Sequence, residues 1–225
     1  MNIGPATGIT TIIPYWGGRE EALVAVLNGA RWNTMVMVPE GLSLSHPNPF
    51  VSVRQVYGIK GWPISDLLNA GAEVSGHNLL NFRGADVPFG EFEKELVMLH
   101  ARDNPCFAGF SHRLDIRLCD PDKEPLAIDI AQKYHGVGVS FYIRREVYDL
   151  VGPWVKYDGY GHEDLDYAYR CRAMLGYYPH ERALPMPVYH YHHAQGPCDH
   201  LDANRTKLEE MMRNTPINPI EITCS

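Results

Sequence analysis

The sequence predicts an α/β protein whose mostly parallel central sheet carries helices on both faces. Short continuous apolar runs, such as residues 9–13 and 35–38, are typical of strands that are buried on both faces. Amphipathic helical segments alternate with these runs, as in βαβ units. Apolar residues make up 45% of the 225-residue chain and charged residues 21%, which provides a sizeable core and excludes wholesale disorder. We expect one domain over residues 1–225.

The first forty residues predict strand, helix and strand in that order. A β-branched run at residues 9–13 predicts the first strand, which ends at Pro14. Residues 20–30 place apolar side chains at helical spacing and two glutamates in the first turn, where carboxylates favour the helix dipole. A second strand over residues 35–38 ends at Pro39. This start predicts parallel pairing of the first two strands.

Strands and helices continue to alternate along the rest of the chain. Over residues 100–136 the pattern of apolar residues predicts secondary structure only weakly. The further predicted strands cover residues 51–56, 78–82, 106–110, 137–143 and 188–192. The further predicted helices cover residues 64–74, 92–99, 144–151, 162–175 and 201–213. The last dozen residues carry two prolines, and we expect them to form a loose tail.

Charge, hydropathy and cysteine content limit the cellular locations and the binding partners that are expected for this protein. The net charge of −7 disfavours a protein that bulk charge holds on nucleic acid or anionic lipid. No apolar run approaches the ~20 residues of a membrane-spanning helix, and we see no signal peptide. Five cysteines without a CxxC motif predict reduced thiols. We therefore expect a cytoplasmic protein, in the host cytoplasm if the source is viral.

Polar or special residues follow three of the predicted strands. They are the segments 14–19, 39–41 and 83–86. Open α/β sheets bind ligands outside the carboxyl ends of their strands, so these segments are candidates for a binding site. A plain turn between strand and helix is the alternative for the Gly17-Gly18 pair.

The strongest local signal is an acidic stretch at residues 157–166, which opens a predicted helix. Glu163 and Asp164 fall in its first turn, where free N–H groups and the helix dipole should keep carboxylates ionised. An ionised, oriented carboxylate is what a general base requires. Helix capping is the alternative, and Asp166, four residues before Arg170, is expected to be structural.

A second signal is the histidine-rich segment at residues 189–193. Three imidazoles close together at the end of a strand can bind a divalent metal. In a regular strand His190 and His192 point one way and His193 the other. A histidine-rich surface strand is the alternative explanation.

Together these segments resemble the GT-A glycosyltransferases, in particular family 2 enzymes with a β-1,4-galactosyltransferase-type C-terminal motif block. The matching motifs are Gly136 to Phe141, Val151-Gly152-Pro153-Trp154, Gly159-Tyr160-Gly161-His162-Glu163-Asp164-Leu165-Asp166, Arg170 and Gly176-Tyr177. Toward the N-terminus, residues 12–15 and 69–76 resemble the first strand and the helix before the family's metal motif. Residues 82–88 stand where the family carries Asp-x-Asp.

The chain departs from the family pattern at three positions. Gly84 replaces the first aspartate of Asp-x-Asp, which leaves Asp86. Glu40 is the one acid after the second strand, where the family has an Asp-rich turn. Tyr160 replaces the usual tryptophan before Gly-x-Glu-Asp. These departures concern metal affinity and nucleotide identity and leave the proposed base in place.

The resemblance implies a GT-A domain with a nucleotide-binding half at residues 9–100 and an acceptor and catalytic half at 101–193. A C-terminal helix and tail follow at residues 194–225. It implies an inverting hexosyltransferase that moves a sugar from a nucleotide-diphospho-sugar, with UDP-sugar favoured, to the hydroxyl of a glycan, protein or other acceptor.

The resemblance also assigns roles to individual residues. Asp164 would be the general base, with Glu163 orienting the acceptor, and Mn²⁺ or Mg²⁺ would be held by Asp86, His193 and His190. The expected nucleotide contacts are Pro14, Tyr15, Arg19, Glu40, Asn69, Arg83 and Ala85. The expected sugar contacts are Gly138, Trp154 and Tyr160, with core packing as the alternative for the two aromatic residues.

Two other functions stay open at this point. One is a degenerate GT-A domain that binds nucleotide or glycan without catalysis, which the loss of a carboxylate at Gly84 favours. The other is a metallohydrolase centred on His190, His192, His193 and Asp86, which leaves the motif block at residues 136–177 unexplained.

Overall fold

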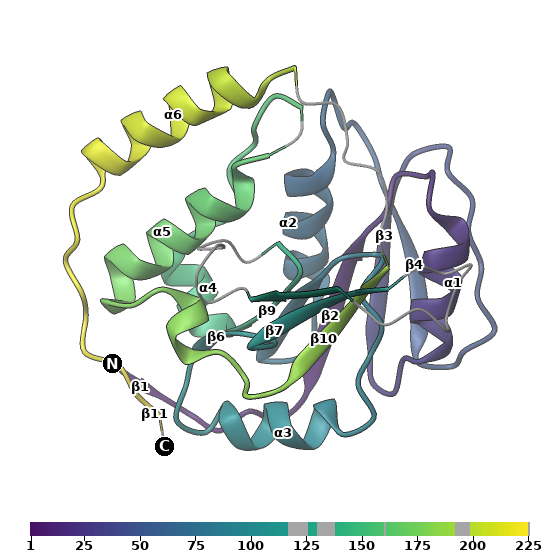
Figure 1. Cartoon of the computed structure of the whole chain (residues 1–225), viewed down its shortest axis with the longest axis horizontal. Coiled ribbons are helices and arrows are strands. Elements are labelled where there is room, and N and C mark those ends of the chain that lie inside the picture. The colour runs from purple at the N-terminus through teal and green to yellow at the C-terminus, as the bar shows by residue number, and fades with distance from the viewer. Residues whose placement is uncertain (117–125, 130–137, 160, 192–198, 225) are drawn as a thin grey trace.

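A computed structural model describes residues 1–116, 126–129, 138–159, 161–191 and 199–224 (Figure 1). The central sheet has six strands in the order β4-β3-β2-β5-β9-β6. Their bounds are β2 (Ile9–Pro14), β3 (Thr34–Pro39), β4 (Val51–Val56), β5 (Leu79–Arg83), β6 (Cys106–Ala108) and β9 (Ser140–Arg144). Strands β4, β3, β2 and β5 are parallel, and β9 runs antiparallel to β5 and β6. The predicted mostly parallel sheet is confirmed.

Helices cover both faces of this sheet, also as predicted. The helices are α1 (Glu20–Asn28), α2 (Ile64–Val74), α3 (Glu93–His100), α4 (Arg145–Val151), α5 (Glu163–Leu175), α6 (Leu201–Asn214) and the 3-10 helix η1 (Pro179–Arg182). Ile12 packs in the cluster of α2, α4 and α5, whereas the next residue, Ile13, packs in the cluster of α1. This alternation follows from the two-residue period of a strand.

Gly71 lets α2 lie close against the central sheet. A Cβ atom at this position would stand 2.4 Å from Ile12 Cγ2 and 3.1 Å from Met37 Cγ. Since no side chain fits in that space, glycine is required where the helix crosses β2 and β3.

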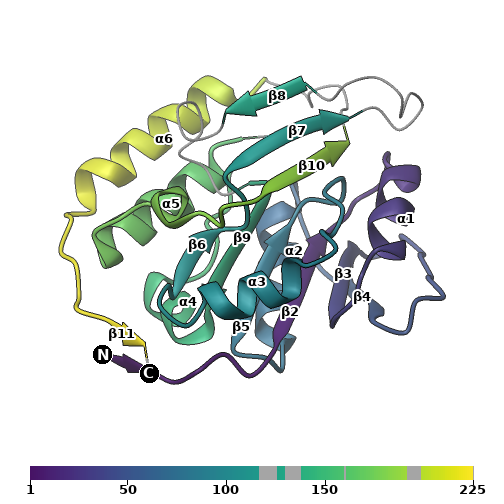
Figure 2. The same cartoon turned by 60° about the horizontal axis from the view of Figure 1, so that its bottom comes forward.

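A smaller sheet lies beyond the end of the central one (Figure 2). It has the order β10-β7-β8, with β10 (Pro187–Tyr191) parallel to β7 (His112–Ile116) and β7 antiparallel to β8 (Leu126–Asp129). The backbone N–H of Tyr191 donates to the carbonyl of Asp86 at 2.8 Å. The end of β10 therefore meets the loop that follows β5. The sequence pattern predicted β10 but neither β7 nor β8.

The C-terminal residues are docked on the protein, so the expectation of a loose tail was wrong. Asn218 and Ile220 donate backbone N–H groups to the last turn of α5, at 3.0 and 2.9 Å. The two ends of the chain then pair as the short parallel strands β1 (Asn2–Ile3) and β11 (Thr223–Cys224) (Figure 1). Backbone hydrogen bonds, which carry no sequence pattern, hold this segment.

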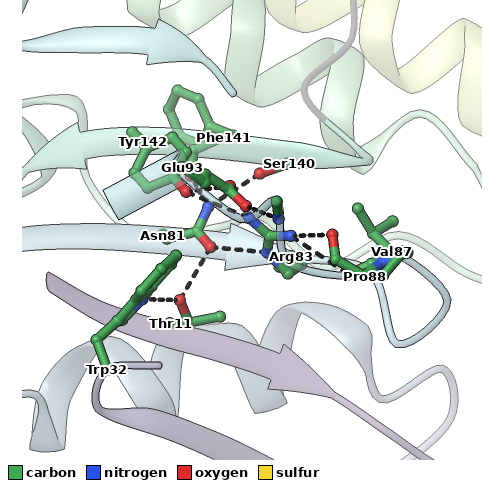
Figure 3. Close-up of polar contacts among 11 residues, drawn as sticks. Thr11, Trp32, Asn81, Arg83, Val87, Pro88, Glu93, Ser140, Phe141 and Tyr142 are labelled. Carbon is green, nitrogen blue, oxygen red and sulfur yellow. Dashed lines mark hydrogen bonds and ion pairs between the residues drawn. The ribbon is translucent and has the colours of Figure 1, made fainter. Parts of the chain in front are cut away.

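A buried ion pair anchors the loop after β5. Arg83 is fully buried and pairs with Glu93 at the start of α3 (Figure 3). Its guanidinium also donates to the carbonyls of Val87 at 3.3 Å and Pro88 at 2.9 Å. Tyr142 of β9 donates to Glu93 at 2.6 Å. One charged side chain thus holds the loop at residues 84–88 to the sheet and to α3.

Breaking this buried ion pair is expected to destabilise the fold strongly. We expect Glu93→Gln to lower the free energy of unfolding by about 3–5 kcal/mol, because it leaves the Arg83 charge buried without its counter-charge. Glu95→Gln, an exposed change on the same helix, should alter it by less than about 0.5 kcal/mol. Urea unfolding of both variants measures the difference. Equal stabilities would show that the pair contributes nothing to folding.

Candidate functional site

The loop after β5 presents Asp86 to two other elements. Asp86 is 4% exposed, and its Oδ2 atom lies 2.5 Å from a guanidinium nitrogen of Arg19, just before α1. Its Oδ1 atom lies 3.6 Å from Nε2 of His190 on β10. Three segments that are distant in sequence therefore converge on one carboxylate.

Two further charged residues complete this group. Asp115 on β7 contacts Nδ1 of His190 at 3.0 Å, and Arg113 contacts Asp115 at 2.9 Å. We call these five residues, Arg19, Asp86, Arg113, Asp115 and His190, the Asp86 cluster. Sequence reasoning missed Arg113 and Asp115, since β7 was not predicted. The one available signal was the spacing of two charged residues that a strand would place on one face.

Gly84 stands where the family 2 pattern has the first aspartate of Asp-x-Asp, and the space beside it is closed. A Cβ atom at residue 84 would stand 2.7 Å from Oδ1 of Asp86 and 3.1 Å from a methyl group of Val87. Any side chain there would displace Asp86 from its present position. The backbone N–H of Gly84 donates to the carbonyl of Val139 at 2.9 Å.

The second group of carboxylates opens α5. Glu163 is 7% exposed, and its Oε2 atom has no hydrogen-bond partner among the described residues. Asp164 keeps part of its surface exposed, and its Oδ1 accepts the N–H of Leu165 at 2.9 Å. Asp166 behaves as predicted: it pairs with Arg170 at 2.5 Å and accepts the hydroxyl of Tyr157 at 2.9 Å.

Burial reverses the expected effect of the helix dipole on these carboxylates. Burial, followed by the charge of Asp164, raises the pKa of Glu163 to about 7. Burial also raises the pKa of Asp164, against the opposing effect of backbone N–H groups that include those of Leu165 and Gly138. The sequence-based expectation that the helix start keeps the carboxylate ionised is therefore wrong for Glu163. Loss of hydration outweighs the dipole when the protein surrounds the carboxylate.

The turn before α5 has a strained backbone, and hydrogen bonds from α6 stabilise it. His162 has φ of 76°, and it is the one residue other than glycine with positive φ in the described part of the chain. Such a conformation costs about 1–2 kcal/mol. Asn204 of α6 is buried and donates to the carbonyls of Asp158 at 2.9 Å and Gly161 at 3.1 Å. Helix α6 therefore helps to hold the turn that places Glu163.

Gly138 and Val139 connect the two groups of carboxylates. A Cβ atom on Gly138 would stand 2.9 Å from Oδ2 of Asp164, so the backbone approaches this carboxylate closely. The next residue, Val139, is hydrogen bonded to Gly84, two residues before Asp86. Asp164 and Asp86 thus lie on segments that touch the same dipeptide, at the carboxyl end of β5.

The expected nucleotide contacts divide into two sets. Pro14, Tyr15, Arg19, Glu40 and Ala85 follow or end β2, β3 and β5, so they share the carboxyl edge of the parallel strands. Tyr15 is 3% exposed and Glu40 is exposed. Open α/β sheets bind ligands at this edge, so Pro14, Tyr15, Arg19, Glu40 and Ala85 stay candidates for ligand contacts.

The other expected contacts serve the fold. The guanidinium of Arg83 is buried in the network described above and presents no surface to a ligand. Asn69 accepts the N–H of Trp154 at 2.8 Å and donates to its carbonyl at 2.9 Å. These two bonds hold α2 against the segment that carries Trp154. Trp154 is 4% exposed and stacks on Tyr167 with ring centroids 4.2 Å apart. Core packing, the alternative for Trp154, agrees with these contacts.

One of the three predicted metal ligands, His193, lies outside the residues that the structure describes. Tyr160, His192 and His193 lie outside the described residues. Among the residues that are described, no group of three or more His, Cys, Asp or Glu side chains is arranged to hold a metal. The two described candidates, Asp86 and His190, stand with a carboxylate oxygen and a ring nitrogen 3.6 Å apart.

Comparisons with known proteins show the fold and no closer relationship. No protein-family model matches the chain, and no curated protein matches it either. Among solved structures, the chain is similar to residues 1–349 of TarS from S. aureus, a family 2 glycosyltransferase, with a TM-score of 0.62 and 10% identity. The match covers 94% of this chain and 67% of that one. The chain therefore has a GT-A-like glycosyltransferase fold. Within the described residues, no helix is long and apolar enough to cross a membrane.

The raised pKa of Glu163 makes stability depend on pH. Between pH 4.5 and about 7 the folded protein holds a proton on Glu163 that the unfolded chain releases, so stability falls as the pH rises through this window. We expect Glu163→Gln to gain up to about 3 kcal/mol over the wild type between pH 5 and pH 8. Urea unfolding at both values measures the gain. Glu210→Gln, an exposed change, should show none, and parallel pH profiles for all three proteins would contradict the assignment.

Proposed function

We propose that this protein is an inverting glycosyltransferase that moves a hexosyl group from a nucleotide-diphospho-sugar to an acceptor hydroxyl. The observation that carries the proposal is the placement of Asp164 beside Gly138, at the sheet edge that also carries Asp86. The GT-A-like fold shared with TarS supports the same reaction class. UDP-sugar is the favoured donor, and the acceptor is a glycan, a protein or another hydroxyl compound.

Asp164 is the proposed general base. The acceptor oxygen attacks the anomeric carbon while the bond from that carbon to the diphosphate oxygen breaks, and Asp164 takes the acceptor proton. A single in-line displacement inverts the anomeric configuration. Burial raises the pKa of Asp164, which makes its carboxylate a stronger base than that of an ordinary aspartate. Glu163, with a pKa of about 7, can donate or accept a hydrogen bond and so orient the acceptor.

Asp86 and His190 are the proposed ligands of Mn²⁺ or Mg²⁺, and His193 is a third candidate. When bound, such an ion offsets the negative charge that develops on the leaving diphosphate. Arg19 has a second part in this scheme. Its guanidinium pairs with Asp86 and its side chain is 30% exposed, so we propose that it also contacts the diphosphate at the same edge.

The donor would lie along the carboxyl ends of the parallel strands. Pro14, Tyr15, Glu40 and Ala85 are the proposed walls of the nucleoside pocket, and Gly138 leaves room for the sugar beside Asp164. Tyr160 is proposed to stack on a sugar ring. We assign Asn69, Arg83 and Trp154 to the fold because their polar groups or rings are occupied by protein contacts.

One observation favours a second candidate, a domain that binds nucleotide or glycan without catalysis. Gly84 removes one carboxylate of the family motif, and the space there is already closed by Asp86. The carboxylates of Glu163 and Asp164 favour the enzyme, since a binding domain has no need of a buried glutamate next to a second carboxylate. The shared fold favours a transferase over a metallohydrolase.

Replacement of the proposed base tests the reaction. We expect Asp164→Asn to lower kcat by about 10²- to 10⁴-fold with little change in donor binding, because only proton transfer is lost. Asp158→Asn, the same change on an exposed aspartate six residues earlier, should keep full activity. Sugar transfer to water or to a panel of acceptors measures both. Full activity in Asp164→Asn would overturn the assignment.

Ligand-induced stabilisation tests the donor class. We expect a UDP-sugar with Mn²⁺ to raise the melting temperature, since ligand at 100 times its Kd stabilises the folded state by about 2.7 kcal/mol. EDTA and Asp86→Asn should each reduce that shift. A panel of UDP, GDP, CMP and dTDP identifies the base. The absence of a shift with every nucleotide in folded protein would contradict the proposed function.

A further inference from the structure

Asn81 of β5 lies at the centre of the buried polar network in Figure 3. It has no exposed surface, and its side chain makes four hydrogen bonds. Oδ1 accepts the hydroxyl of Thr11 at 3.0 Å and Nε–H of Arg83 at 3.1 Å. Nδ2 donates to the hydroxyl of Ser140 and to the carbonyl of Phe141, both at 3.1 Å. Both N–H groups and both lone pairs of the amide are therefore used.

These partners allow only one orientation of the amide. Nε of Arg83 can only donate and the carbonyl of Phe141 can only accept, so Oδ1 must face Arg83 and Nδ2 must face β9. The hydroxyl of Thr11 then donates to Asn81 and accepts the indole N–H of Trp32 at 2.8 Å. The side chain of Asn81 consequently joins three strands, β2, β5 and β9, in a fixed geometry.

The bond to Arg83 leads to the loop that carries Asp86. Because a guanidinium is planar, a contact at Nε fixes the direction of its other nitrogens. The NH1 group of Arg83 donates to the carbonyls of Val87 at 3.3 Å and Pro88 at 2.9 Å, directly after Asp86. Asn81 therefore determines the direction from which Arg83 holds this loop.

The bond to Ser140 leads to the segment beside Asp164. Ser140 is the first residue of β9, and Gly138 stands two residues before it. A Cβ atom on Gly138 would lie 2.9 Å from Oδ2 of Asp164, so this backbone and the carboxylate are in close contact. Asn81 thus holds the strand that begins next to the proposed base.

One backbone hydrogen bond joins the two segments directly. The N–H of Gly84, at the start of the loop, donates to the carbonyl of Val139 at 2.9 Å. This bond lies just beyond the regular pairing of β5 with β9. Its geometry depends on how firmly the ends of these two strands are held, and Asn81 contacts both strands.

We propose that Asn81 is a positioning residue, which fixes the loop that carries Asp86 relative to the segment beside Asp164. This inference rests on the proposed function, in which Asp86 and Asp164 serve one reaction. Asn81 itself touches no substrate. It acts through Arg83 on one side and through Ser140 on the other.

A purely structural role for Asn81 predicts a different result. As one more buried polar contact it would affect only the free energy of unfolding. Thr11→Val is the matched control, because it removes the bonds of Thr11 to Asn81 and Trp32. It leaves the bonds of Asn81 to Arg83 and Ser140 in place.

The first readout needs no substrate: it is the hydrogen exchange of the Gly84 amide, followed by NMR. In Asn81→Ala we expect this amide to exchange about 10-fold faster, relative to the slowest core amides of the same variant. In Thr11→Val the ratio should match the wild type. Ser140→Ala removes only a link to β9 and is expected to accelerate the exchange less. It decides the question if Asn81→Ala does not fold.

The second readout is sugar transfer, measured well below the melting temperature of each variant. We expect Asn81→Ala to lower kcat by about 10- to 100-fold, because small displacements of reacting groups slow a reaction strongly. The KM for the UDP-sugar should change little, since the expected nucleoside contacts lie on other strand ends. Thr11→Val should keep the wild-type kcat.

The outcomes distinguish this inference from the function on which it rests. Unchanged Gly84 exchange or unchanged kcat in a folded Asn81 variant would overturn the positioning role alone. Equal effects in Asn81→Ala and Thr11→Val would do the same. No sugar transfer by the wild type would overturn the proposed function and the positioning role with it. Faster Gly84 exchange together with a lower kcat supports both.

Discussion

The buried pair of Arg83 and Glu93 is the interaction on which the candidate site depends. A guanidinium without solvent contact needs a counter-charge, and Glu93 provides it from α3. The NH1 group of Arg83 donates to the carbonyls of Val87 and Pro88, so the same charge fixes the loop that carries Asp86. A buried ion pair contributes little net stability but strongly penalises any arrangement that separates its partners. It therefore specifies the path of this loop.

Two sheets contribute to the surroundings of Asp86, and each supplies a different kind of group. The central sheet ends in the loop of Asp86, and the small sheet brings His190 and Asp115 to it. The acidic pair on α5 reaches the same edge through Gly138, where the absence of a side chain permits close approach to Asp164. The site is thus an assembly of short contacts between separately built elements. Its chemistry can differ from that of other GT-A-like proteins while the fold stays the same.

The start of α5 combines two energetically unfavourable features, which are buried carboxylates and a residue in a left-handed conformation. Burial disfavours the charges of Glu163 and Asp164, and the turn before them carries a left-handed His162. A protein retains such costs where the surrounding structure enforces them, and here Asn204 of α6 does so. Raised carboxylate pKa values and local strain coincide with the residues proposed for catalysis. This coincidence is a physical argument for function that is independent of any resemblance.

The sequence by itself determined the α/β class, the central strands and the major helices, because apolar periodicity reports burial directly. It also identified Asp86, Glu163, Asp164 and His190 as candidates, since strand ends and helix starts leave local patterns. Only the tertiary structure revealed that Asp115 faces His190, because β7 has a weak pattern and its pairing with β10 spans many residues. Burial of Arg83 and the raised carboxylate pKa values were likewise decided by packing. Hydration and hydrogen-bond partners depend on neighbours that are distant in the chain, and local patterns carry no information about them.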